Sequence, residues 1–167
     1  ERIHPDLRQM FSHTPKLSLL DDIQKTRQMN KEMFKNMPTD SDIPIEQTTI
    51  PGPEDAPEVP VRIYRPQQAG GSLPGLLYIH GGGYILGFAA MNDTTCQQIA
   101  REANCIVVSV DYRLAPEHPF PAGLNDCYAA LQWLADEKNN LGIDINNIGI
   151  TGGSAGGGLA AAAALLA

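Results

Sequence analysis

Apolar residues recur at intervals of three and four along the first forty positions, as on one face of a helix. They are Leu17, Leu20, Ile23, Met29, Met33, Phe34 and Met37. The segment from Pro38 to Pro44 interrupts the pattern, so a helical region is expected to end before it. Because methionine adapts to irregular surfaces, we interpret this face as a packing surface rather than a cofactor site.

From Ile45 the pattern changes to an alternation of apolar and polar residues, which predicts extended strands. Ile45–Ile50 and Val59–Tyr64 alternate in this way, on either side of a segment rich in proline and glycine. A turn between two such segments predicts a hairpin.

Three short apolar runs then alternate with segments that favour helices. The runs are Leu76–Ile79, Cys105–Val110 and Ile148–Thr151. The helices are expected near Thr94–Ala103, from about Ala122 to Lys138, and from Ala155 onward. Apolar strands separated by helices are typical of a parallel sheet covered on both faces. The predicted fold class is therefore α/β, with about five strands, most of them parallel.

The composition is that of a globular protein, with 43% hydrophobic and 19% charged residues among 167. The net charge of −7 arises after residue 45, where twelve acidic residues face five basic ones. A basic surface for nucleic acid is therefore not expected. No apolar run approaches the roughly 20 residues needed to span a bilayer, so no membrane span is expected.

The chain has three cysteines, Cys96, Cys105 and Cys127. An odd number without C-x-x-C spacing predicts neither a disulfide framework nor a metal site. Their apolar surroundings predict small buried thiols, which is consistent with a reducing cytoplasm.

The first chemical motif is Gly152-Gly153-Ser154-Ala155-Gly156, between a predicted strand and a predicted helix. It matches G-x-S-x-G, the nucleophile elbow, in which glycines leave room for a sharp turn. Such a turn exposes the serine oxygen beside a helix N-terminus, whose dipole favours developing negative charge.

The second motif is His80-Gly81-Gly82-Gly83, at the end of another predicted strand. Consecutive glycines let the main chain direct its N–H groups toward one point, as an oxyanion hole requires. His80 is not expected to be the catalytic base, because in hydrolases with a G-x-S-x-G elbow the catalytic histidine follows the serine nucleophile in the sequence. We expect it to shape the loop through its own hydrogen bonds.

The third motif is the run from Asp111 to Ala122, which includes the prolines Pro116, Pro119 and Pro121 around Glu117 and His118. It predicts a stiff loop whose charged residues pair with one another. His118 is interpreted as a loop residue without a catalytic role.

Together these three motifs resemble the signatures of hormone-sensitive-lipase-like esterases of the α/β-hydrolase fold, over residues 45–167. The resemblance implies a carboxylic-ester hydrolase without metal or cofactor, acting on small short- to medium-chain acyl esters. It places Ser154 as the nucleophile, and the N–H groups of Gly82, Gly83 and Ala155 as the oxyanion hole. Gly81 is a neighbour of that hole, and Tyr84 is expected to line the substrate pocket. Residues 1–44 resemble the start of the family's helical cap.

The catalytic aspartate and histidine of this family lie well downstream of the serine, and no residue here is assigned to either role. All four histidines, His4, His13, His80 and His118, precede Ser154. We therefore expect residues 1–167 alone to be inactive and poorly folded, as an excerpt of a chain about twice as long or as one piece that another piece completes. A homo-oligomer is the other partnership that the sequence leaves open. Gly153 also departs from the family, which commonly has an acidic residue there.

Two other functions are compatible with parts of the sequence. The glycines from Thr151 to Gly158 also match the dinucleotide-binding pattern of short-chain dehydrogenases, although in that family the pattern follows the first strand. A non-catalytic ligand receptor on the same fold is the second alternative, because one fold supports both binding and catalysis.

Overall fold

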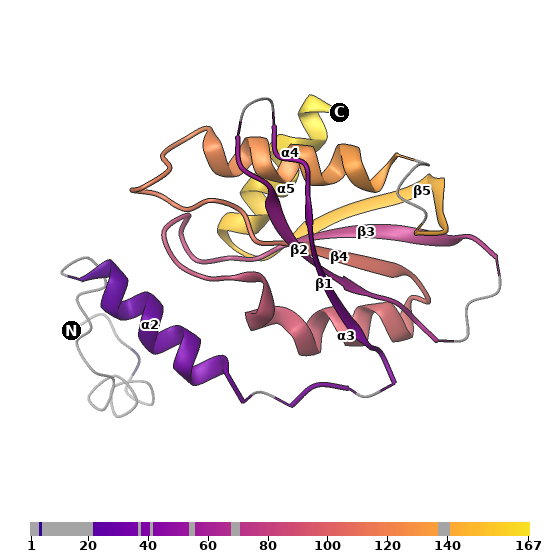
Figure 1. The fold of residues 1–167 in the computed structure, drawn as a ribbon, viewed down its shortest axis with the longest axis horizontal. Coiled ribbons are helices and arrows are strands. Elements are labelled where there is room, and N and C mark those ends of the chain that lie inside the picture. The colour runs from indigo at the N-terminus through magenta and orange to yellow at the C-terminus, as the bar shows by residue number, and fades with distance from the viewer. Residues whose placement is uncertain are drawn as a thin grey trace.

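Five strands form one mixed sheet at the centre of the molecule, in the order β1-β2-β4-β3-β5 (Figure 1). The computed structural model describes residues 4, 22–36, 38–40, 42–53, 56–67, 71–136 and 141–167. The strands are β1 (Ile45–Ile50), β2 (Val59–Tyr64), β3 (Leu73–Ile79), β4 (Ile106–Val110) and β5 (Ile143–Gly152). β3 is parallel to β4 and β5, whereas β2 is antiparallel to β1 and β4. All described strands except β2 thus share one direction, and the α/β prediction is confirmed.

The predicted hairpin is confirmed by the pairing of β1 with β2. Ile45 lies opposite Tyr64, and Ile50 lies opposite Val59. Alternate residues of β2 are buried, as the alternating sequence predicts for a strand with one face on the core.

Helices cover both faces of the sheet. The helices α4 (Ala122–Leu134) and α5 (Ala155–Leu166) lie on one face, and α3 (Asp93–Glu102) lies on the other (Figure 1). A short 3₁₀ helix, η1 (Ala89–Asn92), leads into α3. The helix α2 (Ile23–Phe34) lies apart from the sheet, near the loops that follow β3 and β4 (Figure 1). All three predicted strand–helix units therefore exist close to their predicted positions.

The strand β4 is buried along its whole length and contributes to two hydrophobic clusters. Val108 and Val110 join Leu134 of α4 in one cluster, and Val107 joins Cys96 of α3 in the other. Successive strand residues point to opposite faces, so a strand covered on both sides must be apolar throughout.

The strand β5 begins earlier than the apolar run Ile148–Thr151 predicts. Ile143 already pairs with Leu73, and an irregularity in the register separates this pair from the pair of Gly75 with Ile148. Within the intervening segment the Asp144 carboxylate accepts hydrogen bonds from Asn146 and Asn147. Because these residues are polar, the first half of β5 does not form an apolar run in the sequence.

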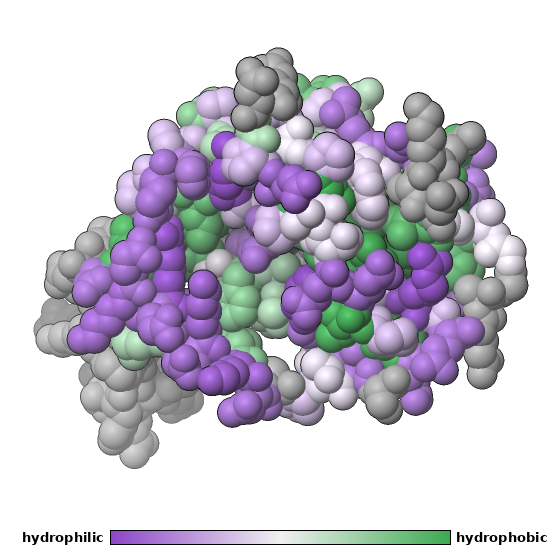
Figure 2. Space-filling view, in the orientation of Figure 1, coloured by the Kyte–Doolittle hydropathy of each residue, from purple (hydrophilic) through white to green (hydrophobic). Residues whose placement is uncertain are grey.

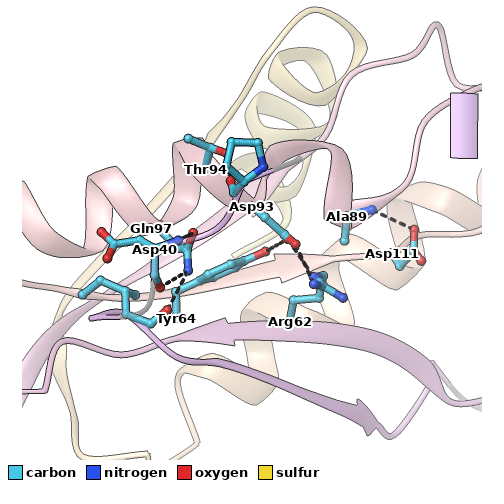
Figure 3. A network of polar contacts seen from close by, with 10 residues as sticks. Asp40, Arg62, Tyr64, Ala89, Asp93, Thr94, Gln97 and Asp111 are labelled. Carbon is cyan, nitrogen blue, oxygen red and sulfur yellow. Dashed lines mark hydrogen bonds and ion pairs between the residues drawn. The ribbon is translucent and has the colours of Figure 1, made fainter. Parts of the chain in front are cut away.

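A network of polar side chains joins β2 to the start of α3 (Figure 3). The Asp93 carboxylate accepts hydrogen bonds from Arg62 Nε at 2.8 Å, from Arg62 Nη2 at 2.6 Å and from the Tyr64 hydroxyl at 2.6 Å. Asp93 is 7% exposed and Tyr64 is fully buried. Burial raises the pKa of Tyr64, so its hydroxyl keeps the proton that it donates. The network satisfies a carboxylate that burial alone would strongly disfavour.

The methionines of α2 do not form the packing surface that their spacing predicts. Met29 is 45% exposed and Met33 is 69% exposed, and Figure 2 shows the outer surface of α2 as largely hydrophilic. The more buried positions are instead Ile23, Thr26, Arg27, Asn30 and Phe34. These residues share one helical face, but three of the five are polar. Leu17, Leu20 and Met37 lie outside the described residues.

The three cysteines are buried and free, as predicted. Burial raises the pKa of the Cys96 thiol to about 12, which keeps it protonated. Among the described residues no helix is long and apolar enough to cross a membrane. In the same part of the chain no group of three His, Cys, Asp or Glu side chains is placed to hold a metal ion.

Candidate active site

Ser154 occupies the turn between β5 and α5, with φ 54° and ψ −121°. A non-glycine residue in this region is strained by roughly 1–3 kcal/mol, a strain typical of functional turns. Ser154 is exposed at the end of the sheet where the parallel strands have their carboxyl termini. The turn therefore has the backbone geometry of the nucleophile elbow predicted from the sequence.

Two glycines make this turn sterically feasible. A Cβ atom on Gly156 would lie 2.1 Å from the Ile79 carbonyl oxygen, and one on Gly152 would lie 2.6 Å from the same atom. Real Cβ atoms do not approach backbone oxygens so closely. Without side chains at both positions, the elbow packs directly against the end of β3.

The glycine loop that follows β3 passes beside Ser154. A Cβ atom on Gly81 would lie 2.8 Å from the Gly153 oxygen and 3.4 Å from the Ser154 Cβ. Gly82 has φ 136° and Gly83 has φ 61°, which are conformations that favour glycine. The structure thus brings together the first two motifs, which lie far apart in the sequence.

Three backbone N–H groups near the elbow are unpaired. Within the described part of the chain, no hydrogen bond uses the N–H of Gly82, Gly83 or Ala155. The Gly82 oxygen, in contrast, accepts bonds from the N–H groups of Ile85 at 3.2 Å and Leu86 at 2.9 Å. These hydrogen bonds therefore fix the Gly82 carbonyl and leave the N–H groups of Gly82 and Gly83 available to an incoming group.

Tyr84 lies between this loop and α5, with φ 66° and 49% of its surface exposed. Its hydroxyl approaches α5 at Gly158, where a Cβ would lie 2.8 Å away. Tyr84 also lines a largely apolar pocket of about 350 Å³, together with Phe120, Leu124 and Leu159. Ser154 is not among its lining residues, but Gly158, one helical turn later, is. The pocket is thus close to the elbow without containing the serine.

His80 is 1% exposed and holds the start of the glycine loop. Its Nδ1 lies 2.8 Å from the Gly81 oxygen, which confirms the expectation that it shapes the loop by hydrogen bonding. Burial lowers the pKa of His80, although the Gly81 contact and the Asp111 charge oppose this effect. A neutral, enclosed imidazole is suited to positioning the loop and has no access to a substrate.

The charged residues of the 111–122 loop do not pair with one another, so that prediction is wrong. The Arg113 guanidinium bonds the carboxylate of Asp126 on α4, with Nη2 to Oδ1 at 2.8 Å. Glu117 pairs with Arg27 of α2 at 2.8 Å. Asp111 accepts the N–H of Ala89 at 3.1 Å (Figure 3). Each of these side chains thus reaches an element outside the loop.

Two of these interaction partners, Asp126 and Arg27, were not predicted from the sequence. Asp126 is a fully buried acid among the apolar residues of α4, and such a position signals a buried cationic partner. Arg27 has no comparable sequence signal, because an arginine on a polar helix normally faces solvent. His118 is exposed, as expected of a loop residue.

Comparison with known proteins tests the resemblance. The family model described as "alpha/beta hydrolase fold" matches residues 76–167. The chain belongs to the α/β-hydrolase fold family. Among its relatives, esterase LipI of Mycobacterium tuberculosis is 40% identical to this chain over 164 residues. The matched region covers 95% of this chain and 50% of LipI. Carboxylesterase NlhH of the same organism is 46% identical over 123 residues, 74% of this chain and 38% of NlhH.

Solved structures of α/β-hydrolases support the same family assignment. The structure titled "Bacterial Heroin Esterase" superposes with a TM-score of 0.86 at 37% identity, covering 98% of this chain and 52% of that one. These relatives confirm the resemblance to hormone-sensitive-lipase-like esterases. The chain spans about half the length of the relatives it matches.

Proposed function

We propose that the protein carrying this chain is a carboxylic-ester hydrolase that uses Ser154 as its nucleophile. The free N–H groups of Gly82, Gly83 and Ala155, beside an exposed serine on a strained turn, are the observation that carries the proposal. The names of the relatives, including the ethyl acetate hydrolase of Pseudomonas putida at 44% identity, support the same chemistry.

In the proposed reaction the Ser154 Oγ attacks the ester carbonyl carbon, and its proton passes to a general base. The carbonyl oxygen becomes an oxyanion, which the N–H groups of Gly82, Gly83 and Ala155 stabilise, with Gly81 supporting the loop. Collapse of the tetrahedral intermediate releases the alcohol and leaves an acyl-serine, which water then hydrolyses. The base and its carboxylate partner are not assigned to any residue of this chain.

The substrate we propose is a small ester with a short or medium acyl chain. A pocket of about 350 Å³ lined by Tyr84, Phe120 and Leu124 suits an apolar group of this size. We also propose that residues 1–44 are a cap segment and residues 45–167 part of the catalytic domain. The contacts of α2 with the loops after β3 and β4 support this division.

The dehydrogenase alternative is not favoured by the fold. The glycine pattern from Thr151 to Gly158 follows β5, the last strand of the described sheet in chain order, with four strands before it. Dinucleotide-binding glycines follow the first strand of their domain. No described feature favours the receptor alternative, which the experiment below separates from catalysis.

The decisive experiment compares Ser154→Ala with wild type in the complete protein. We expect the variant to lose nearly all hydrolysis of a p-nitrophenyl ester and all labelling by a fluorophosphonate, in which Oγ displaces fluoride from phosphorus. Ser72→Ala, at an exposed position before β3, is the matched control and keeps both. A residual rate above that in water is expected, because an intact oxyanion hole still acts. Unlabelled wild-type protein that binds but does not cleave the ester would indicate a receptor.

A further inference from the structure

Arg27 of α2 binds three acceptors on two loops of the catalytic body. Its Nε donates to the Ile85 oxygen at 2.9 Å, and its Nη2 donates to the Ala115 oxygen at 2.8 Å. Its Nη1 donates to the Glu117 carboxylate at 2.8 Å. The side chain is only 17% exposed, so these bonds are partly shielded from water. The planar guanidinium thereby fixes the distance between two backbone carbonyls.

Both carbonyls belong to segments that hold the glycine loop. The Ile85 N–H donates to the Gly82 oxygen at 3.2 Å, and the Ala115 N–H donates to the Tyr84 oxygen at 3.0 Å. Hydrogen bonds therefore connect Arg27 through Ile85 to Gly82, which carries one of the free N–H donors, and through Ala115 to Tyr84, which follows Gly83 in the loop. Displacement of Arg27 would release both ends of this chain.

Within the described residues, α2 makes few other side-chain contacts with the rest of the chain. Phe34 meets Phe88 edge to face, with centroids 6.3 Å apart, and Gln24 donates to Glu117. Phe88 lies after the glycine loop, and Glu117 lies in the 111–122 loop. The same two loops thus receive every one of these contacts, which concentrates the influence of α2 on the oxyanion region.

We propose that Arg27 is a positioning residue for the esterase reaction: by bridging the Ile85 and Ala115 carbonyls it holds the glycine loop in the geometry that stabilises the oxyanion. This inference rests on the proposed function. An oxyanion hole acts only if its donors lie at hydrogen-bond distance from the developing charge, so a shift of the loop lowers the rate. Arg27 itself touches neither the serine nor the free N–H groups.

The proposal assigns the effect to the carbonyl bonds and not to the ion pair. Lysine can pair with Glu117, but a single ammonium lacks the fork that reaches two carbonyls in fixed directions. Glu117→Gln, in contrast, removes the ionic partner and leaves the bonds from Arg27 to Ile85 and Ala115 in place. The two variants therefore separate the two roles of the guanidinium.

The test compares Arg27→Ala, Arg27→Lys and Glu117→Gln in the complete protein. Lys25→Ala, an exposed change on the same helix, is the matched control. For each variant, kcat and KM for a p-nitrophenyl ester are measured at a temperature where circular dichroism shows it folded. The inhibition constant of a trifluoromethyl ketone, whose serine adduct places an oxyanion in the hole, is the readout that a merely structural role does not move.

We expect Arg27→Ala to lower kcat by roughly 10- to 100-fold and to raise the inhibition constant of the ketone by a similar factor. KM should change by less than about threefold. Arg27→Lys should show most of this loss, whereas Glu117→Gln and Lys25→Ala should stay near wild type. If Arg27→Ala detaches α2, the lysine variant still reports on the carbonyl bonds.

The proposal is overturned if Arg27→Ala matches Lys25→Ala in kcat and ketone affinity. It is also overturned if only KM rises, because Arg27 would then bind the substrate, or if Glu117→Gln is as damaging as Arg27→Ala. A wild-type protein without hydrolysis that depends on Ser154 would overturn the proposed function itself, and this inference with it.

Discussion

The ring of Tyr112 stacks on the ring of His80, with centroids 4.3 Å apart and planes inclined by 14°. The Tyr112 hydroxyl also donates to the His80 backbone oxygen at 3.0 Å. The two residues follow the neighbouring parallel strands β4 and β3, which end at the same edge of the sheet. One tyrosine thus holds both the side chain and the main chain of the residue that opens the glycine loop.

Tyr112→Phe should destabilise the protein without removing the stacked ring. The His80 carbonyl then loses its donor, and an unsatisfied buried acceptor costs roughly 1–2 kcal/mol. Urea unfolding measures this loss as a lower midpoint at unchanged slope. Tyr128→Phe on α4 is the matched control, because Tyr128 is only partly buried. Equal stability of the two variants would contradict the prediction.

The burial of His80 predicts a loss of stability in mild acid. Burial lowers the pKa of His80 below its unfolded value, despite the opposing effects of the Gly81 oxygen and Asp111. The unfolded chain then binds the proton more readily, so stability is fully present above the unfolded pKa and falls as the pH decreases below it. The limiting slope for one proton is about 1.4 kcal/mol per pH unit.

The measurement is the free energy of unfolding between about pH 7.5 and 5.5, a window centred near the unfolded pKa of histidine. His80→Asn should be less stable than wild type at neutral pH but should lose less stability on acidification. His118→Asn, at an exposed loop position, should keep the wild-type slope. Parallel slopes for wild type and His80→Asn would show that this imidazole does not control the acid sensitivity.

The sequence was most informative where packing imposes a simple period. The apolar runs of β3 and β4 and the alternation of β1 and β2 follow from burial on two faces or one, so these strands could be predicted. The first half of β5 could not, because side chains of Asp144, Asn146 and Asn147 bond one another there and interrupt the apolar pattern.

The same distinction applies to the candidate site. The role of some glycines can be predicted from a sequence, because only glycine permits the close approach of position 156 to Ile79 and the φ of 136° at position 82. Long-range ion pairs leave no such trace. The pairs Arg27–Glu117 and Arg113–Asp126 depend on which elements the fold brings together, and loop composition alone suggested the wrong partners.

Asp93→Asn should be among the more destabilising polar substitutions in this chain. The change leaves Arg62 without its charge partner in a site where the side chains are 17% and 10% exposed. Breaking a buried ion pair from one side typically costs about 3 kcal/mol or more. Arg101→Ala is the comparison, because the Arg101–Asp40 pair is exposed at Arg101 and a surface pair contributes only about 0–1 kcal/mol. The prediction fails if both variants lose equal amounts in urea unfolding.

Gly153 and Gly156 lie in the same elbow but differ in the space around them. A Cβ atom on Gly153 would meet nothing within 4 Å, and its φ lies outside the left-handed region. At Gly156 a Cβ would collide with the Ile79 oxygen at 2.1 Å. Gly153 is also the position where the esterase family commonly has an acidic residue. Only one of the two glycines is therefore required by the fold.

Gly153→Asp should raise the melting temperature and leave Ser154-dependent hydrolysis in place. A side chain restricts the unfolded chain, which stabilises by roughly 0.4–1 kcal/mol where the native backbone accepts it. A negative charge before α5 adds about 0.3–1 kcal/mol through the helix dipole. Gly153→Ala separates the two effects, because it supplies the restriction without the charge. Gly156→Ala is the opposite control and should destabilise the protein, since the Ile79 carbonyl would have to move. A lower melting temperature for Gly153→Asp and Gly153→Ala alike would show that the elbow needs glycine at both positions.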